Sequence, residues 1–178
     1  ESNRREAPLL PYSVVACSVV FFWSISVRAL IYTVMPTVGA DLGLSSSMVG
    51  LVIAGMLLGY AAGSWFAGTL PGSRKARILA GILLSIPGAV LVSTARDLWP
   101  LVVGVLAIGF GTGVYLPLGL SLIVDVGGER GKARHMVPHE GSATLASFSG
   151  AAFVAVSLAW TDWHGSILLW CASGAVGL

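Results

Sequence analysis

Six apolar runs, separated by short polar connections, make up most of the chain. A membrane-spanning helix needs about 20 predominantly apolar residues, and every run reaches that length except the last, which ends with the sequence at Leu178. The runs predict transmembrane helices over residues 12–38, 48–70, 76–95, 98–124, 137–160 and 166–178. We therefore expect an all-α integral membrane protein with six transmembrane helices, preceded by a polar, cytoplasmic amino-terminal segment over residues 1–11 and forming part of a longer chain.

The composition excludes a soluble globular domain. Hydrophobic residues make up 56% of the chain and charged residues 10%, against roughly 45–50% and about 25% in soluble domains. The basic residues lie in short connections rather than on one face, so no nucleic-acid partner is expected. Both cysteines, Cys17 and Cys171, fall in predicted spans, which argues against a disulfide or a zinc site. The expected partner of such a surface is the lipid bilayer.

The charged connections predict the orientation of the chain. Eight of the ten Lys and Arg residues fall on one side of the predicted bundle. They are Arg4 and Arg5 before the first helix, Arg74, Lys75 and Arg77 between the second and third, and Arg130, Lys132 and Arg134 between the fourth and fifth. By the positive-inside rule this side is cytoplasmic. We expect a multi-pass protein of a bacterial cytoplasmic (inner) membrane with its amino terminus in the cytoplasm.

Arg28 is the only charged residue in the first apolar run. A charge in the middle of a membrane helix costs at least ~2.5–3.5 kcal/mol and is normally turned toward a cavity or the bundle interior. Ser24 and Tyr32 lie one helical turn before and after it, and the three side chains form a donor-rich patch that suits a carboxylate or phosphate. Tyr115 is a further residue that we expect to line this cavity. The alternative is a structural Arg28, paired with an acid or with helix carbonyl groups.

His139 and Glu140 begin the fifth predicted helix. They are candidates for handling a proton, since ionisable residues inside membrane bundles commonly form proton relays. The alternative is structural: Pro138 fits the first turn of a helix, and Glu140 would stabilise its positive end. At 1.5 Å per residue, Glu140 and Arg28 are expected to lie roughly 15 Å apart along the membrane normal, too far for a direct salt bridge.

The sequence argues against an enzyme. The run Gly119-Leu120-Ser121-Leu122 lacks the second glycine that a rhomboid-type protease has after its serine, and the sixth predicted helix contains no histidine. A haem held by two histidines is also disfavoured, because His139 and His164 come from opposite ends of the fifth predicted helix. We expect no catalytic residue, cofactor or metal.

The connections carry motifs of a known type. The first predicted helix ends in Met-Pro and is followed by Gly-Ala-Asp-Leu-Gly-Leu-Ser at residues 39–45. Residues 68–77 take the place of a Gly-x-Leu-x-Asp-Arg-x-Gly-Arg-Arg signature, with Gly72 near the position of the acidic residue, and residues 129–133 are similar to the loop that leads into the fifth helix. With these motifs the chain resembles the amino-terminal half of a major facilitator superfamily transporter.

The resemblance implies a transporter of two six-helix halves with the substrate between them near the midplane. The carboxy-terminal half is expected in the same gene or as a separate chain. Arg28, eight residues before Pro36, is similar to the arrangement in organic-anion and organophosphate carriers, which favours a small anionic substrate moved by proton symport or exchange. Arg74, Lys75 and Arg77 occupy the cytoplasmic gating loop. The alternatives are a drug/proton antiporter and a non-transporting structural subunit.

Overall fold

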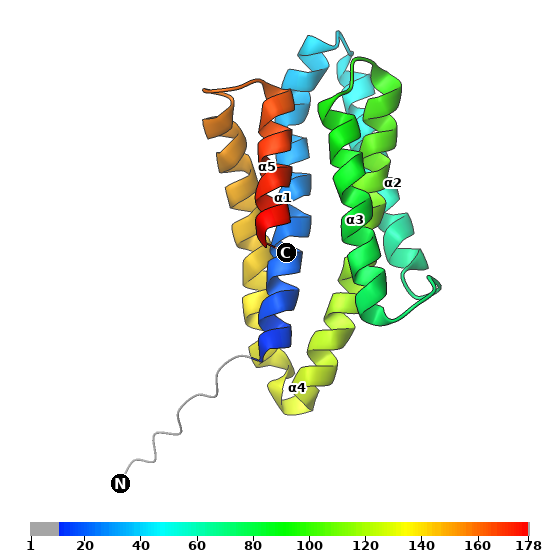
Figure 1. Cartoon of the computed structure of the whole chain (residues 1–178), viewed down its shortest axis with the longest axis vertical. Coiled ribbons are helices and arrows are strands. Elements are labelled where there is room, and N and C mark those ends of the chain that lie inside the picture. The colour runs from blue at the N-terminus through cyan, green and yellow to red at the C-terminus, as the bar shows by residue number, and fades with distance from the viewer. Residues whose placement is uncertain (1–10, 178) are drawn as a thin grey trace.

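The computed structural model describes the backbone of residues 11–177 and, within that range, every side chain except those of residues 129, 130 and 174–177. The described chain is all-helical, as predicted, and contains no β-strand. Its helices are α1 (Tyr12–Asp41), α2 (Ser46–Phe66), α3 (Arg74–Ser93), α4 (Leu98–Ser157) and α5 (Trp163–Gly177). Figure 1 shows them as an elongated bundle. The predicted polar segment 1–11 lies outside the described residues except for its last position.

The helix α4 consists of two helices joined at Gly128. The backbone of Gly128 has φ 55° and ψ −172°, a conformation that only glycine adopts readily. Figure 1 shows the chain turning back here, so that the first part of α4 runs beside α2 and α3 and the second part runs beside α1. We predicted a non-helical connection between residues 124 and 137. Instead, helical backbone continues on both sides of Gly128 through this stretch, because charged residues such as those found there are good helix formers.

Four helical segments of the described chain are long and apolar enough to cross a membrane. They are Tyr12–Asp41, Ser46–Phe66, Arg74–Ser93 and Leu98–Gly128. The second part of α4 is rich in serine, glycine and alanine and carries Pro138, His139 and Glu140, while α5 has only 15 residues. The length and composition of these helices therefore support several membrane crossings, whereas the count of six stays a prediction.

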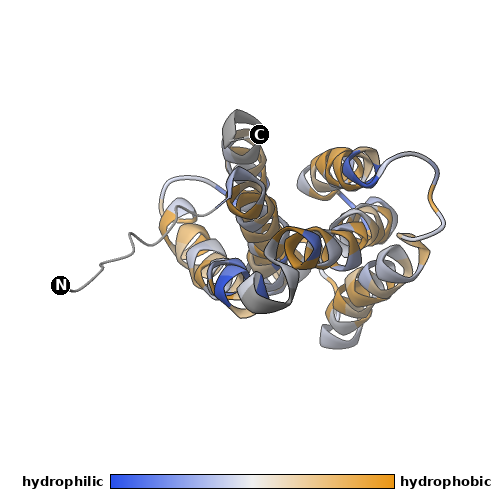
Figure 2. Ribbon diagram, turned by 90° about the horizontal axis from the view of Figure 1, so that it is seen from below, coloured by the Kyte–Doolittle hydropathy of each residue, from blue (hydrophilic) through white to orange (hydrophobic). Residues whose placement is uncertain are grey.

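Large apolar side chains are exposed along the bundle. Leu58 and Trp65 of α2 have relative exposures of 67% and 82%, and Phe148 in the second part of α4 has 73%. Figure 2, coloured by hydropathy and seen along the bundle, shows apolar residues on the outer sides of the helices as well as toward the centre. A helix that is apolar on all sides is typical of a membrane span.

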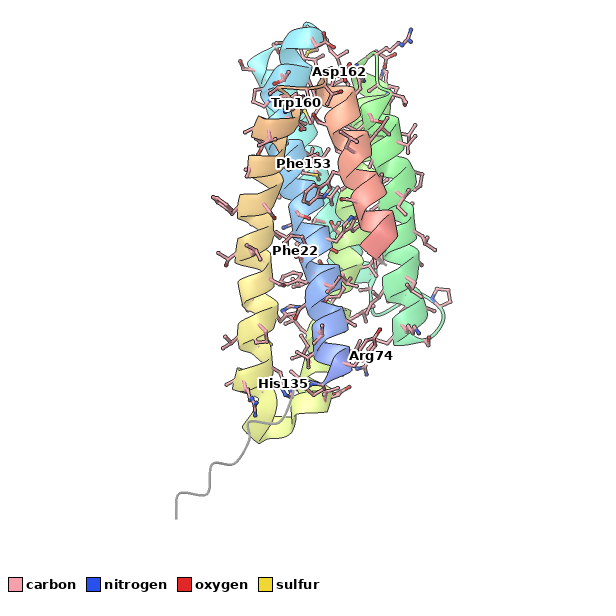
Figure 3. All side chains as sticks on the ribbon, turned by 60° about the vertical axis from the view of Figure 1, so that its left-hand side comes forward. Phe22, Arg74, His135, Phe153, Trp160 and Asp162 are labelled. Atoms are coloured by element: carbon pink, nitrogen blue, oxygen red, sulfur yellow. The ribbon has the colours of Figure 1, made fainter. Side chains whose placement is uncertain are left out.

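The basic connections lie at one end of the bundle. Figure 3 shows Arg74 and His135 at the end where α1 begins, and Trp160 and Asp162 at the opposite end. The loop between α2 and α3 and the bend in α4 therefore share one end, which we call the basic end. This is the arrangement that the charge pattern of the sequence predicts.

Glycines bring α2 and α3 against the first part of α4. A Cβ atom at Gly63 of α2 would clash with the backbone of α4, and one at Gly113 of α4 would clash with the backbone of Tyr60. On the other side, a Cβ atom at Gly111 would clash with the backbone of α3. Helices in lipid associate through such small residues because they let two backbones approach closely. These contacts fix the rotation and height of α2 relative to α4.

Replacing Gly63 by alanine is expected to destabilise the bundle by about 1–3 kcal/mol, the usual cost of overpacking, because the added methyl group meets rigid backbone. Gly50→Ala in the same helix is the matched control, since a Cβ atom there has no other atom within 4 Å. Thermal unfolding of the two purified variants, followed by circular dichroism, makes the comparison. Equal unfolding temperatures would contradict this account of the packing.

Candidate functional site

The donor-rich patch predicted on α1 lies near the middle of that helix. Ser24, Arg28 and Tyr32 follow one another at intervals of one turn. Ser24 is buried, with 2% of its surface exposed, and Arg28 and Tyr32 are half-buried. The Cζ atom of Arg28 lies 4.2 Å from the centre of the Tyr60 ring in α2. A guanidinium over the face of a tyrosine makes a cation–π interaction, which holds Arg28 against α2.

Tyr60 lies against this patch. The sequence indicated Tyr60 only as an aromatic residue that could line a cavity or serve in packing, and its contact with Arg28 was not predicted. Its position depends on the contact between its backbone and Gly113 in α4, which no local sequence pattern reveals. The ring covers one face of the Arg28 guanidinium. Because the N–H groups of a guanidinium point outward in its own plane, stacking leaves them free to donate to a carboxylate or phosphate.

Two polar atoms of the patch lack hydrogen-bond partners in the part of the chain that the structure describes. The hydroxyl of Ser24 and the Nε of Arg28 are buried and have no hydrogen-bond partner among the described residues. Arg28 also forms no ion pair within the described part of the chain. Buried polar groups are normally hydrogen-bonded, so this patch can donate to a ligand. The alternative in which an acid of this chain neutralises Arg28 finds no support among the described side chains.

A second polar cluster lies closer to the basic end and centres on His139. This side chain is completely buried, and its ring stacks on Phe21 of α1 with the ring centres 4.1 Å apart. Its Nε2 lies 3.1 Å from the hydroxyl oxygen of Tyr115, and that hydroxyl donates to the carbonyl oxygen of Cys17 at 2.6 Å. The cluster therefore joins α1 to both parts of α4.

The structure places Tyr115 in the His139 cluster rather than beside Arg28. Cys17, which accepts the Tyr115 hydrogen bond, precedes Arg28 by eleven residues on α1. At 1.5 Å per residue this is about 16 Å. The structure therefore does not bring Tyr115 into contact with the donor-rich patch on α1, and a role for Tyr115 in substrate binding stays a prediction.

Glu140 extends the His139 cluster toward the surface. Its Oε1 lies 3.3 Å from Nδ1 of His139, and its side chain is 57% exposed. The structural alternative for Glu140 required a helix that begins at Pro138. That alternative fails because helical backbone continues from Gly128 through Pro138 to Ser157, so Glu140 is well inside the second part of α4, beyond the reach of its positive end.

The loop between α2 and α3 is tied to its neighbours by two of its three cations. Arg77 donates from Nε to the carbonyl oxygen of Gly72 at 3.0 Å, and Arg74 pairs with Asp125 of α4 at 2.5 Å. The exposed pair contributes at most about 1 kcal/mol. Lys75 is exposed. Gly72, which stands near the place of the signature's acidic residue, has φ 97°, a conformation that disfavours any residue with a side chain.

Comparison with known proteins agrees with the helical architecture. The model of the Major Facilitator Superfamily matches residues 14–178. A triacylglyceride transporter of Mycolicibacterium smegmatis is 27% identical over 146 residues, which cover 79% of this chain and 26% of that protein. The chain thus spans about a quarter of the length of this relative. Because the family model matches nearly the whole chain, this protein belongs to the Major Facilitator Superfamily.

Proposed function

We propose that this chain is part of a secondary active transporter that moves a small organic anion, and that Arg28 binds the anion. The observation that carries the proposal is a half-buried arginine in a membrane helix, without an ion pair among the described residues and next to a buried hydroxyl without a partner. An arginine left unpaired in this setting is costly. An anionic ligand offsets that cost, because it supplies the missing acceptor atoms.

The geometry of the patch suits a planar or tetrahedral anion. Tyr60 covers one face of the Arg28 guanidinium, so a ligand approaches its edge. A carboxylate or phosphate there accepts two parallel N–H bonds, which are stronger and more directional than bonds from a lysine. Ser24 and Tyr32 lie one turn away on either side and orient the rest of the ligand through their hydroxyl groups.

His139 and Glu140 handle the proton in this proposal. Their separation from Arg28 supports a proton site distinct from the anion site, since the two clusters lie at different depths on α1. Coupling therefore runs through α1 itself, which carries Arg28 and also the Cys17 carbonyl that Tyr115 contacts. Proton symport and anion exchange are both compatible with two separate clusters on one helix.

The proposed transporter has a second half. A carboxy-terminal six-helix half, in the same gene or as a separate chain, closes the substrate site from the other side. The proposal places the basic end in the cytoplasm of a bacterial cell, with Arg74, Lys75 and Arg77 in the gating loop, because cytoplasmic loops carry an excess of Lys and Arg. In this setting the exposed apolar side chains of α2 and α4 face lipid or the other half.

A lipophilic substrate is the second candidate, because the related M. smegmatis protein is named a triacylglyceride transporter. One structural observation favours it. An open, almost wholly apolar groove lies between α1 and the second part of α4, lined by Val14, Val15, Ser18, Val19, Phe22, Pro138 and Ser142. Such a groove accepts an acyl chain or a drug-sized apolar molecule. For a cationic drug, however, Arg28 is repulsive.

Ligand-induced thermal stabilisation of the purified protein, with any chain that copurifies, tests the proposal against carboxylates, phosphates and lipophilic cations. An anion at a hundred times its Kd is expected to add about 2.7 kcal/mol of stability, and Arg28→Ala is expected to remove this gain. Stabilisation by lipophilic cations alone would overturn the anion proposal in favour of a drug/proton antiporter. No response to any anion would also reject it.

A further inference from the structure

We propose that His139 and Glu140 share one exchangeable proton between Nδ1 and Oε1, and that Tyr115 is the positioning residue that keeps it there by fixing the tautomer of His139. The inference deepens the proton step of the proposed function and rests on it for its role in transport. The hydrogen-bond geometry carries it in three steps. The first two place the hydrogens of the Tyr115 hydroxyl and of Nε2, and the third places one proton between Nδ1 and Oε1.

The first step concerns the Tyr115 hydroxyl. Its oxygen lies 2.6 Å from the carbonyl oxygen of Cys17. A backbone carbonyl can only accept a hydrogen bond, and two oxygen atoms this close need a hydrogen atom between them. The single hydroxyl hydrogen of Tyr115 therefore points at Cys17.

The second step concerns Nε2 of His139, which lies 3.1 Å from the same hydroxyl oxygen. Because Tyr115 has no second hydrogen to give, the oxygen acts as the acceptor and Nε2 carries the hydrogen. Tyr115 thus selects the Nε2–H tautomer. In a neutral imidazole, the other nitrogen then has a lone pair and no hydrogen.

The third step concerns the contact between Nδ1 of His139 and Oε1 of Glu140, which measures 3.3 Å. An ionised carboxylate is only an acceptor, so it repels an unprotonated Nδ1. The contact forms when one proton lies between the two atoms, either on the imidazole or on the carboxyl group. The pair therefore holds one proton more than a neutral His139 beside an ionised Glu140.

The two residues that share the proton differ in their access to water. His139 is fully buried, with the Phe21 ring stacked on it at 4.1 Å. Burial disfavours a charged imidazole, and the neighbouring Glu140 is what favours a proton here. The side chain of Glu140 is 57% exposed and gives the shared proton a route to water. When the proton leaves to water, the lone pairs of Nδ1 and Oε1 face each other, and the Glu140 side chain turns outward while the bond to Tyr115 persists.

Other titratable groups near this cluster come from three elements. Cys17 of α1, Lys75 of α3 and Tyr115 line one groove together, and His135 lies one turn before His139 in α4. The side chain of His139 itself contacts Tyr115, Phe21 and Glu140. Glu140 is therefore the residue that shares the proton with His139, and Tyr115 determines which ring nitrogen is available for it.

Nitrogen-15 NMR of the histidine-labelled protein in lipid nanodiscs tests the inference. The chain has three histidines, and loss of one resonance set in His139→Gln assigns the signals of His139. In the unsubstituted protein, Nε2 is expected to stay protonated across the pH range while only Nδ1 changes. In Tyr115→Phe, the neutral ring is expected to show both tautomers. Tyr12→Phe, an exposed tyrosine on the same groove, is the matched control and leaves the spectrum unchanged.

Two results would overturn the inference. One is a neutral His139 with its hydrogen on Nδ1 in the unsubstituted protein, a result that needs no variant to fold. The other is an unchanged tautomer in a folded Tyr115→Phe protein. The measurement requires no transport. If the spectra agree with expectation and uptake proves independent of pH, the proton-coupling part of the proposed function fails and the shared proton stands.

Discussion

Arg28→Ala is expected to reduce uptake of the transported anion by at least about a hundredfold. Two charge-assisted hydrogen bonds from the guanidinium, each worth about 1.5–3 kcal/mol, account for that loss. Arg28→Lys is expected to retain more activity, with a loss of about tenfold, because the ammonium keeps the charge but loses the planar pair of donors and the stacking on Tyr60.

The measurement is uptake of a radiolabelled anion into proteoliposomes, using the anion that stabilises the purified protein most. Arg96→Ala is the matched control, since Arg96 is exposed in the connection between α3 and α4 and lies outside the donor-rich patch. The amount of protein in the membrane is compared for all variants. Uptake that survives Arg28→Ala at normal protein levels would remove Arg28 from the binding site.

The α1 part of the donor-rich patch was predictable because it is local. Ser24, Arg28 and Tyr32 share a face through the helical repeat alone, and the apolar context makes a single arginine conspicuous. The contact with Tyr60 was not predictable in this way. It depends on how α2 is rotated against α4, and glycine contacts set that rotation. A sequence pattern shows that Gly113 permits close packing but does not show which side chain of α2 then reaches Arg28.

Tyr115 shows the same limit, because the sequence does not fix how deep in the bundle its side chain lies. A residue count places an aromatic side chain within a span, but its height in the bundle also depends on where the helix begins and how it is tilted.

The bend in α4 changed the predicted position of Glu140 within its helix. Polar residues between 124 and 137 resemble a loop by composition, yet they continue the helices on both sides of Gly128, and this moves Glu140 from a helix start to a helix interior. The fold class was therefore easier to predict than the roles of individual polar residues.

Glu140→Gln is expected to flatten the pH dependence of uptake. If the unsubstituted protein couples uptake to this proton, as proposed, its uptake falls as pH rises, by about tenfold per pH unit where the site has lost its single proton. Glutamine cannot carry that proton, but its amide can still donate to Nδ1 of His139 and mimic the protonated pair. Uptake by the variant should therefore stay within about twofold across the same range, since the contact that the proton normally makes is permanently present.

Asp162→Asn is the matched control for removing one carboxylate. Asp162 lies at the opposite end of the bundle (Figure 3), and its side chain accepts from the backbone N–H of Gly165 at the start of α5. Asparagine serves as well as aspartate in such a cap, so this variant should fold normally and keep the full pH dependence. A steep pH dependence retained in Glu140→Gln would show that the proton driving transport is carried elsewhere. A flat profile in Glu140→Gln alone would place that proton on the His139 cluster, at a different depth from the anion, so that α1 must transmit the coupling between them.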